Sequence, residues 1–470
     1  MKHRRISRAL AAAAVGVALL AAPGQAHAPA DGAGGVGDSY WPLDGNGGID
    51  VQSYLIRDRY DFDTRRLEGS TVIRLRTTQE LSSFSLDFLL PVKQVWVDGV
   101  RTPHSQSQRH ELRITPAAGL PAGSLHRVLV HYAGKPDTER YAGERNWLAN
   151  RHEVVTMNEP HMAPWWFPVN DHPSDKALVT MEITVPRGKQ VVGNGRLDWR
   201  RSRGETTTWR WSAAEPMAPY LAFFAAGDFT IAKGSHDGLP WLVAVSRRLH
   251  PADQRASMKL MRRTPQVIDR LEDDLGPYPF SVTGGLTTSL QPGFALENQT
   301  RPIYPAVGAG AVWLVVHELA HQWFGDHVAV ARWRDIWINE GFATFMEWRW
   351  EERTGGRTGA EILESAHAAT PASSTFWSVT VGDPGPDNLF SGAVYDRGAM
   401  TLQALRNRVG DEVFWRLLRT WIAEQGGGNA TSEEFEELAA RISGQDLTGF
   451  FAAWLRTPAK PASTSANGLG

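Results

Sequence analysis

Hydrophobic and polar residues alternate along much of the first half of the chain, beginning near Asp50. Phe84, Leu86 and Phe88, for example, are separated by a serine and an aspartate. Short runs of this kind, interrupted by Gly, Pro and Asp, are typical of strands that bury one face of an antiparallel sheet. The pattern therefore predicts an N-terminal antiparallel β domain over residues 29–228.

The spacing of hydrophobic residues changes to that of helices in the second half. Strands are still predicted around residues 239–246, and a long loop is predicted over residues 366–392. Apolar residues three and four positions apart predict helices over residues 251–275, 308–325, 339–353, 398–422 and 431–442. Residues 229–457 are therefore predicted to be a mixed domain, which makes the chain an α+β protein of two domains. Residues 458–470 are predicted to form a flexible tail.

The beginning of the chain has the pattern of an export signal. Residues 2–5 are basic, residues 9–22 are apolar, and an Ala-His-Ala triplet that ends at Ala28 has the small-x-small form of a cleavage site. The apolar run is too short to cross a bilayer comfortably. The sequence therefore predicts a signal peptide over residues 1–28, cleavage near Ala28, and a secreted protein without a membrane anchor.

Composition excludes several classes of function. The 470 residues include 49 Lys and Arg against 51 Asp and Glu, which gives a net charge of −2, and they include no cysteine. This balance lacks the basic excess of most nucleic-acid-binding proteins, so no nucleic-acid partner is expected. The absence of cysteine excludes disulfides, thiolate catalysis, iron–sulfur clusters and cysteine-ligated zinc.

One predicted helix contains the sequence His317-Glu318-Leu319-Ala320-His321. Helical residues four positions apart are separated by about 40° around the axis, so both imidazoles point the same way. Two neutral imidazoles on one face form half of a zinc site. Glu318, about 100° away, can reach a water at the metal without binding the metal itself. The run before the motif is apolar, which indicates a buried helix on which these polar groups need partners.

A third ligand is needed to complete such a site, and zinc hydrolases often use a carboxylate. Glu340 is the candidate, because it is the acid in a short apolar stretch 19 positions after His321. Asp326 and Asp335 are the rivals. Asp326 is also close enough in sequence to support a ligand histidine from behind.

At this point the chain resembles the M1 (gluzincin) family of aminopeptidases. His317, His321 and Glu340 have the order and spacing of that family. Three further segments resemble family motifs: residues 295–298 (Ala-Leu-Glu-Asn) its Gly-Ala-Met-Glu-Asn exopeptidase motif, residues 395–399 (Tyr-Asp-Arg-Gly-Ala) its Tyr-x-Lys-Gly-Ala segment, and residues 157–160 (Met-Asn-Glu-Pro) an N-domain segment near the substrate amine. The resemblance extends from about residue 45 to Pro458.

The resemblance implies a saddle-like N-terminal β domain, a thermolysin-like catalytic domain, and a zinc-dependent aminopeptidase that hydrolyses N-terminal residues from peptides. It implies one zinc ion per chain, bound by His317, His321 and Glu340. Glu318 would act as the general base, and Tyr395 would stabilise the oxyanion of the tetrahedral intermediate. The implied substrate-binding residues are Glu297 and Glu159, which would hold the free α-ammonium, together with Ala295 and Asn298. The expected partners are peptides with a free N-terminus, and the protein is expected to be a monomer.

Departures from the family pattern bear on specificity. Phe294 replaces the first glycine of the exopeptidase motif and Leu296 replaces its methionine, so a different first specificity pocket is expected. The sequence also stops about 130 residues after Glu340. The large helical C-terminal domain of many family members is therefore expected to be absent, which would leave a more open cleft.

Two alternative functions remain at this stage. Zinc endopeptidases of the thermolysin type share the His/Glu/His core, but they have no need of the segment around Glu297. The second alternative is a non-catalytic binding module that keeps the fold, for which the loss of a ligand or of Glu318 would be evidence. No such loss is seen, so aminopeptidase activity is the leading prediction.

Overall fold

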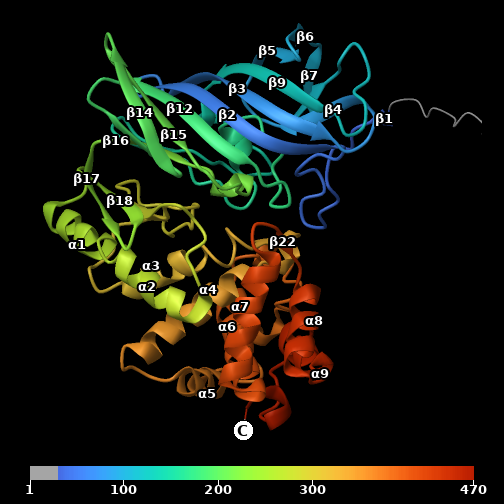
Figure 1. Cartoon of the computed structure of the whole chain (residues 1–470), viewed down its shortest axis with the longest axis vertical. Helices are drawn as coiled ribbons and strands as arrows, with labels where there is room; N and C mark the ends of the chain where they lie inside the picture. The colour runs from blue at the N-terminus through green and yellow to red at the C-terminus, as the bar shows by residue number, and fades with distance from the viewer. Residues whose placement is uncertain (1–29, 109, 470) are drawn as a thin grey trace, which may run out of the picture.

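The computed structural model describes residues 30–108 and 110–469. The predicted signal peptide, residues 1–28, lies outside the described residues. Figure 1 shows a β-rich part, coloured blue to green, stacked on a mainly helical part, coloured yellow to red. The predicted α+β architecture of two domains is confirmed. Among the helices that the structure describes, none has the length and apolar character needed to cross a membrane.

The N-terminal part is built on an eight-stranded sheet. In spatial order its strands are β14 (Arg196–Arg203), β15 (Thr206–Ser212), β12 (Leu178–Pro186), β2 (Ile49–Asp61), β3 (Arg66–Thr77), β9 (Leu125–Gly134), β5 (Val92–Val97) and β6 (Val100–Arg101). β12 and β2 are parallel, and the other neighbours are antiparallel. In β15, Thr207, Trp209 and Trp211 are buried while the residues between them are partly exposed, which is the alternation of a sheet with one covered face.

Two four-stranded sheets and three short helical turns complete this part. One sheet has the order β1 (Ala30–Asp31), β4 (Leu81–Asp87), β8 (Glu111–Ile114) and β7 (His104–Gln108). The other has the order β10 (Leu148–Ala149), β11 (Val154–Val155), β16 (Phe224–Gly227) and β13 (Gln190–Gly193). The turns are η1 (Pro136–Thr138), η2 (Ala163–Trp165) and η3 (Pro219–Leu221). The segment of residues 157–160 follows β11 directly, and this placement matters for the site described below.

The second part begins with a small mixed sheet and continues with helices. The sheet has the order β17 (Phe229–His236), β18 (Leu239–Ser246), β19 (Thr283–Thr287) and β20 (Ile303–Tyr304), and it is parallel from β18 onward. The α-helices are α1 (Pro251–Met261), α2 (Thr264–Leu275), α3 (Val312–Ala320), α4 (Trp337–Arg353), α5 (Gly359–Ala369), α6 (Gly392–Val409), α7 (Asp411–Gln425), α8 (Ser432–Ser443) and α9 (Thr448–Phe451). Shorter elements are β21 (Ala329–Val330), β22 (Asn429–Ala430), η4 (Trp333–Asp335), η5 (Thr375–Ser378), η6 (Pro386–Asn388), η7 (Ala452–Arg456) and η8 (Ser465–Asn467).

Several helices differ from the sequence predictions. The helix expected over residues 251–275 is two helices, because Pro265 has no backbone N–H to continue α1 and instead lies at the start of α2. The helix expected over residues 398–422 is divided at Gly410, whose φ of 85° is in the left-handed region. α6 also begins six residues earlier than expected, so Tyr395 lies in its first turn rather than before it. The long loop expected over residues 366–392 holds the end of α5 and two 3₁₀ turns.

The segment expected to be a flexible tail, residues 458–470, is attached to neighbouring elements at several of its described residues, although others are exposed. Lys460 Nζ donates to the carbonyl of Thr370 at 3.0 Å, and Asn407 Nδ2 donates to that of Gly468 at 3.0 Å. The last described residue, a leucine, is buried. The polar and small residues of this segment predicted that it would be flexible. In the structure its backbone carbonyls accept hydrogen bonds from side chains of the helices, and these bonds hold it in place.

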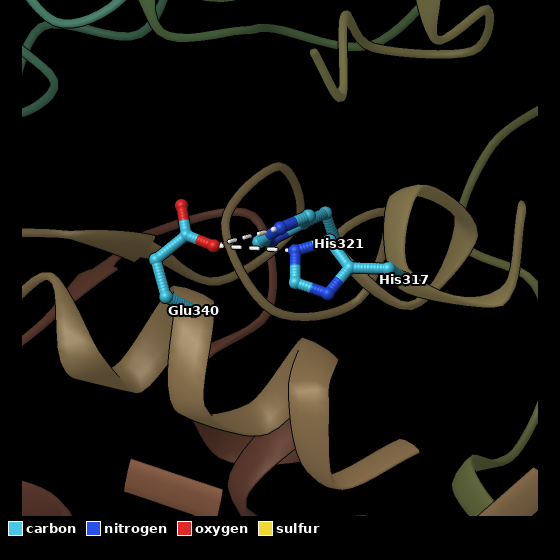
Figure 2. A group of neighbouring side chains, drawn as sticks. All are labelled: His317, His321 and Glu340. Atoms are coloured by element: carbon cyan, nitrogen blue, oxygen red, sulfur yellow. Dashed lines mark hydrogen bonds and ion pairs between the residues drawn. The ribbon is translucent and has the colours of Figure 1, made fainter. Parts of the chain in front are cut away.

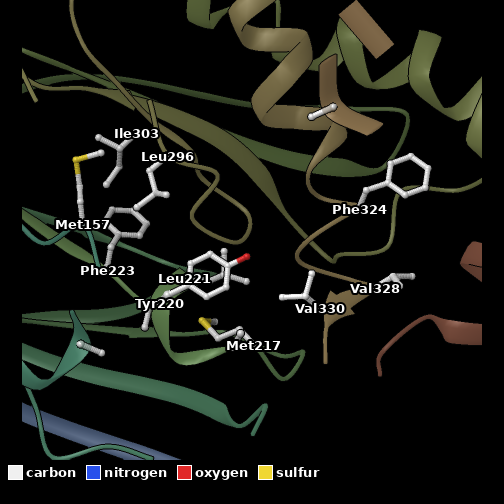
Figure 3. Packing of buried hydrophobic residues seen from close by; sticks show 14 of the residues in the cluster. Met157, Met217, Tyr220, Leu221, Phe223, Leu296, Ile303, Phe324, Val328 and Val330 are labelled. Carbon is white, nitrogen blue, oxygen red and sulfur yellow. The ribbon is translucent and has the colours of Figure 1, made fainter. Parts of the chain in front are cut away.

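The two parts of the protein share one hydrophobic core. Figure 3 shows the packing where they meet, with Met157, Met217, Tyr220, Leu221 and Phe223 from the N-terminal part and Leu296, Ile303, Phe324, Val328 and Val330 from the second part. All of these side chains are buried. The relative position of the two parts is therefore fixed by apolar burial as well as by the polar contacts that follow.

Arg301 supplies one of the polar contacts between the parts. Its guanidinium is fully buried and donates to the carbonyls of Gly193, Gly195 and Leu242, the last two at 3.2 and 3.3 Å. Gly193 and Gly195 belong to the N-terminal part, and Leu242 lies in β18. Burial lowers the pKa of Arg301 to about 10. A buried guanidinium bound to carbonyls fixes the segment that follows Glu297.

Replacing Arg301 with methionine is expected to destabilise the protein by about 3–5 kcal/mol, because three buried carbonyls would lose their donor. Urea unfolding followed by tryptophan fluorescence measures this change. Arg74→Met is the control, since Arg74 is exposed on β3 and its replacement should cost no more than about 0.5 kcal/mol. Equal unfolding midpoints for the two variants would contradict the role given to Arg301.

Candidate active site and metal centre

α3 is a short buried helix with two histidines at its C-terminal end. Its apolar residues include Val315 and Val316, which are fully buried. The helix ends at Ala320, so it is shorter than expected, and His321 is its C-cap residue. His317 and His321 are both buried and their rings lie 4.7 Å apart, centre to centre. The predicted convergence of the two imidazoles is thus present, with one of them at the helix end.

Glu340 completes the group from the neighbouring helix. It lies in the first turn of α4, where the positive end of the helix dipole favours a carboxylate. Its Oε2 is 3.3 Å from Nε2 of His317 and 3.4 Å from Nε2 of His321, as Figure 2 shows. The three donor atoms lie within 4.8 Å of one another. The geometry brings together the three residues that the sequence analysis put forward as metal ligands.

Neither of the two rival acids joins the group of His317, His321 and Glu340. Asp335 accepts hydrogen bonds from Arg332 at 2.8 Å and from the hydroxyl of Ser432 at 2.7 Å, which attaches η4 to the start of α8. Asp326 is buried, and neither of its carboxylate oxygens has a hydrogen-bond partner among the described residues. The expected support of a histidine by Asp326 is wrong, because Nδ1 of His321 faces the carbonyl of Phe324 at 3.0 Å instead.

A carboxylate that the sequence analysis missed supports the other histidine. Nδ1 of His317 is 2.7 Å from Oε1 of Glu347, which lies two turns after Glu340 on α4. Partners on Nδ1 hold both imidazoles with Nε2 directed at Glu340, and such partners increase the affinity of histidine for a metal. The seven-residue spacing from Glu340 was the one available signal, since it places both acids on the same face of a helix.

This donor set fits a catalytic zinc ion. Burial raises the pKa of Glu340, but the imidazoles of His321 and His317 outweigh that effect and lower the pKa to about 2, so the carboxylate is ionised. Two imidazole nitrogens and one carboxylate leave a fourth position of a tetrahedron open, which is the arrangement of catalytic rather than structural zinc sites.

The metal centre faces a cavity of about 840 Å³ between the two parts of the protein. Its wall is acidic, because Glu159, Glu297 and Glu318 line it beside the ligand Glu340. Burial raises the pKa of Glu318 to about 8, and Glu297 and Glu340 contribute to this rise. Glu318 is next to His317 in sequence and its carboxylate lies within 4.8 Å of a ring nitrogen of His321, but among the described residues it forms no hydrogen bond or ion pair with the three clustered ligands.

Glu297 and Glu159 reach the cavity from opposite parts of the protein. One carboxylate oxygen of each is buried without a hydrogen-bond partner among the described residues. Burial raises the pKa of both groups, and the negative charge of Glu297 raises that of Glu159 further. The two acids repel one another, and a cation that entered from the cavity would relieve this repulsion and pair with their buried oxygens.

Tyr395 is placed by a close crossing of α4 and α6. Its ring is stacked on that of His317, with centres 5.9 Å apart and planes 19° apart. The crossing depends on Gly341 and Gly398, since a Cβ added to Gly398 would lie 2.7 Å from the Cα of Gly341. Neither position has room for a methyl group, so the two glycines bring Tyr395 and Glu340 to the same cavity.

Gln322 fixes Glu297 relative to the metal helix and was not identified from the sequence. It lies just after α3, its Nε2 donates to the carbonyl of Glu297 at 2.9 Å, and its Oε1 accepts from the N–H of Thr300 at 2.8 Å. These two hydrogen bonds go to the segment that carries Glu297, and two longer ones join Gln322 to the hydroxyl of Tyr278 at 3.4 Å and to the carbonyl of Glu318 at 3.5 Å. It is a positioning residue for the acidic wall of the cavity.

The other residues of the exopeptidase-like segment divide between cavity and core. Ala295 and Phe294 line the cavity, as expected. Asn298 is buried outside the cavity lining, and its Nδ2 donates to the carbonyl of Leu221 at 3.1 Å, so it holds the two parts together. Leu296 packs in the core between the parts (Figure 3). Of the two departures from the family pattern, only Phe294 therefore reaches the cavity.

Comparison with known protein families agrees with this site. The family model described as "Peptidase family M1 domain" matches residues 306–454, and the one described as "Peptidase M1 N-terminal domain" matches residues 51–221. Together they cover more than half of the chain, in the order that the family requires. The chain belongs to peptidase family M1. The residues of this M1 chain that match the catalytic-domain model include His317, His321 and Glu340.

Solved structures and curated relatives resemble the M1 chain over most of its length. The M1 zinc metallopeptidase of Deinococcus radiodurans is 25% identical, and the similarity covers 91% of this chain and 99% of that one with a TM-score of 0.81. A mutant of that enzyme bound to a Tyr-Ser-Ala substrate has a TM-score of 0.80 at the same identity, with 92% and 100% covered. The probable aminopeptidase 1 of Sulfurisphaera tokodaii is 24% identical over 88% of this chain and 54% of its own length. The chain thus spans about half the length of the curated relatives that it matches.

Replacing Glu347 with glutamine is expected to weaken zinc binding at this centre by about 10–100-fold, because the support of His317 would lose its charge. Competition with a chromogenic chelator measures the affinity. Glu364→Gln, on the exposed face of α5, is the matched control and should bind zinc as the wild type does. If Glu347→Gln also bound zinc normally, the contact with His317 would have no role in holding the metal.

Proposed function

We propose that this protein is a zinc-dependent aminopeptidase that removes N-terminal residues from peptides. The observation that carries the proposal is the pair of acids Glu297 and Glu159 beside the zinc-like centre, each with a buried carboxylate oxygen that has no hydrogen-bond partner among the described residues. A free α-ammonium group is a cation that a peptide brings to this position only at its N-terminus. An internal segment of a peptide would leave the buried oxygens of both acids without a partner, at a cost in binding. The names of the matched relatives, which include aminopeptidases, also support the proposal.

In this proposal His317, His321 and Glu340 hold one zinc ion per chain. Bound zinc would supply a Lewis acid for the peptide carbonyl and a lowered pKa for water in the site. Glu318 takes the proton from the attacking water and passes it to the leaving amine. Tyr395, whose burial raises the pKa of its phenol well above the usual value, keeps its proton and donates a hydrogen bond to the oxyanion. Ala295 and Phe294 contact the first residue of the substrate.

The alternative within the same fold is an endopeptidase. It would use the same zinc ligands and Glu318, but it would gain nothing from Glu297 and Glu159. Phe294, Trp313 and Phe390 are large apolar residues that line the cavity and are 42–53% exposed, so the mouth of the site offers apolar contacts to a peptide of either kind. An experiment that distinguishes an aminopeptidase from an endopeptidase must therefore test whether the free amine of the peptide is recognised.

We also propose that the protein is exported to the cell exterior and acts there as a monomer on peptides. The support for export is the leader pattern of residues 1–28. Comparison of the N-terminal sequence of the protein recovered from culture medium with that in the cells tests this proposal, and cleavage near Ala28 is the expected result.

Replacing Glu318 with glutamine is expected to lower kcat by about 10²–10⁴-fold, because the proton acceptor would be lost. Zinc content should stay at the wild-type level, since Glu318 is not a ligand. Turnover of a chromogenic aminoacyl amide measures kcat, and elemental analysis of the same sample measures the zinc content. A loss of zinc in step with activity would show that Glu318 binds the metal and would contradict the assignment of base.

Replacing Glu297 with glutamine is expected to reduce kcat/KM for a free peptide by about 30-fold to several-thousand-fold, because an ammonium group would lose a buried anionic partner worth about 2–5 kcal/mol. The N-acetylated form of the same peptide is the substrate control, and the wild type should cleave only the free form. Glu437→Gln, exposed on α8, is the control variant and should retain the preference.

Two results would contradict the aminopeptidase proposal. The first is comparable cleavage of the free and acetylated peptides by the wild type. The second is a Glu297→Gln enzyme whose ratio of the two rates equals that of the wild type. Either result would favour the endopeptidase, because the amine would then have no part in recognition.

A further inference from the structure

A second group of acids is buried in the N-terminal part, apart from the catalytic cavity. It consists of Asp44, Asp87, Glu111 and Asp171, each no more than 5% exposed. They come from four segments: the loop before β2, the end of β4, the start of β8 and the loop before β12. None of these four side chains lines the cavity described above. The N-terminal part therefore gathers four carboxylates in its interior for a reason separate from the catalytic centre.

Asp87 and Glu111 are the pair that most needs an explanation. They lie directly opposite each other on the antiparallel strands β4 and β8. Like charges at opposed positions of a sheet destabilise it. Asp87 is held in place by three donors, the N–H groups of Gly45 and Asp171 and the side-chain amide of Asn46. Glu111 has no such support, because neither of its carboxylate oxygens has a hydrogen-bond partner among the described residues.

His110 occupies the centre of the group. Its Nε2 lies 3.2 Å from the carbonyl oxygen of Leu43, 3.4 Å from Oδ1 of Asp87, 3.7 Å from Oδ1 of Asp44 and 3.9 Å from Oε1 of Glu111. The donor atoms of Asp87, His110 and Glu111 all lie within 4.8 Å of one another. The side chain of Glu111 is only 6% exposed, so its two partnerless oxygens are directed into this group rather than toward solvent.

The charges of the group do not balance among the described residues. His161 is the cation on its border, with Nδ1 2.6 Å from Asp44 and Nε2 2.9 Å from Glu144, and these acids raise the pKa of His161 to about 10 against the effect of burial. No described Lys or Arg forms an ion pair with any of the four acids. Ionised together, four acids would exceed the available positive charge.

We propose that Asp87, His110 and Glu111 form a second binding site for a divalent transition-metal ion, of which zinc is the best match. One imidazole nitrogen and two carboxylates are donors that zinc accepts in tetrahedral sites. The ion would supply the missing positive charge and separate the two opposed acids. The oxygens of Leu43 and Asp44 lie beside it and complete the polar surroundings.

The buried position gives this site a structural role. It joins β4 to β8 and, through Asp44, to the loop that precedes β2. It is also linked to the catalytic cavity, because Asp44 contacts His161 and His161 contacts Glu144, which lines that cavity. The metal therefore stabilises the N-terminal part and holds one wall of the cavity, without taking part in the chemistry.

The test removes the catalytic zinc site first, so that any remaining metal belongs to the second site. The protein with both His317→Ala and His321→Ala is loaded with zinc, passed through a desalting column and analysed for metal. It should retain about one equivalent per chain, and adding Glu111→Gln should remove that equivalent. Glu205→Gln, exposed in the N-terminal part, is the matched control and should leave it unchanged.

Thermal unfolding of the same three proteins gives a second measurement that needs no activity. Zinc should raise the unfolding midpoint of the His317→Ala, His321→Ala protein by about 5 °C over its value in chelator. With Glu111→Gln added, zinc should have no effect, while the midpoint in chelator should rise because the opposed charges are gone. The rise of the midpoint in chelator would also show that the protein with Glu111→Gln is folded.

The proposal fails if the His317→Ala, His321→Ala protein retains no zinc and its midpoint does not respond to zinc. It also fails if Glu111→Gln leaves the bound equivalent in place. Neither outcome bears on the aminopeptidase proposal, because no peptide is cleaved in these experiments.

Discussion

Repulsion among the glutamates that face one cavity is the constraint on which the catalytic half of the molecule depends. Glu340 is neutralised by two imidazoles, whereas Glu159, Glu297 and Glu318 are pressed together with burial raising the pKa of each. Such a cluster costs folding free energy, and functional sites commonly carry this kind of cost. The surrounding structure holds the acids in place through helix packing and through hydrogen bonds such as those of Gln322. A cation that enters the cavity would relieve this repulsion.

Residue spacing along the chain predicted what local geometry dictates. The four-residue interval between His317 and His321 places two imidazoles together in any α-helix, and Glu340 stood out as an acid in an apolar stretch. Residues that act across the fold could not be recognised in this way. Glu347 and Gln322 have ordinary surroundings in the sequence, and their contacts exist only after α3, α4 and the segment around Glu297 have packed together. The predicted helix boundaries were wrong near Pro265 and Gly410, where a proline and a glycine separate consecutive helices.

Motif residues in this protein divide into those that face substrate and those that hold the motif in place. Glu297 faces the cavity, while Asn298, next to it, binds a carbonyl of the other domain. Arg397 lies two residues after Tyr395 and is fully buried, where its guanidinium donates to the carbonyls of Trp377 and Thr457 at 3.0 and 2.7 Å. A match to a short motif therefore indicates a site, but it does not show which motif residues face the cavity and which ones hold the others in position.

The contact between Gly341 and Gly398 has a consequence for how this protein can diversify. Glu340 and Tyr395 are carried by two helices whose backbones touch, so the reactive centre moves, if at all, as a single unit. Phe294 and Phe390 belong to loops at the mouth and are half exposed. Substitutions there can reshape which side chains are admitted while the helix crossing stays as it is. Substrate range and bond cleavage are thereby uncoupled, and new preferences can be engineered or evolve one loop residue at a time.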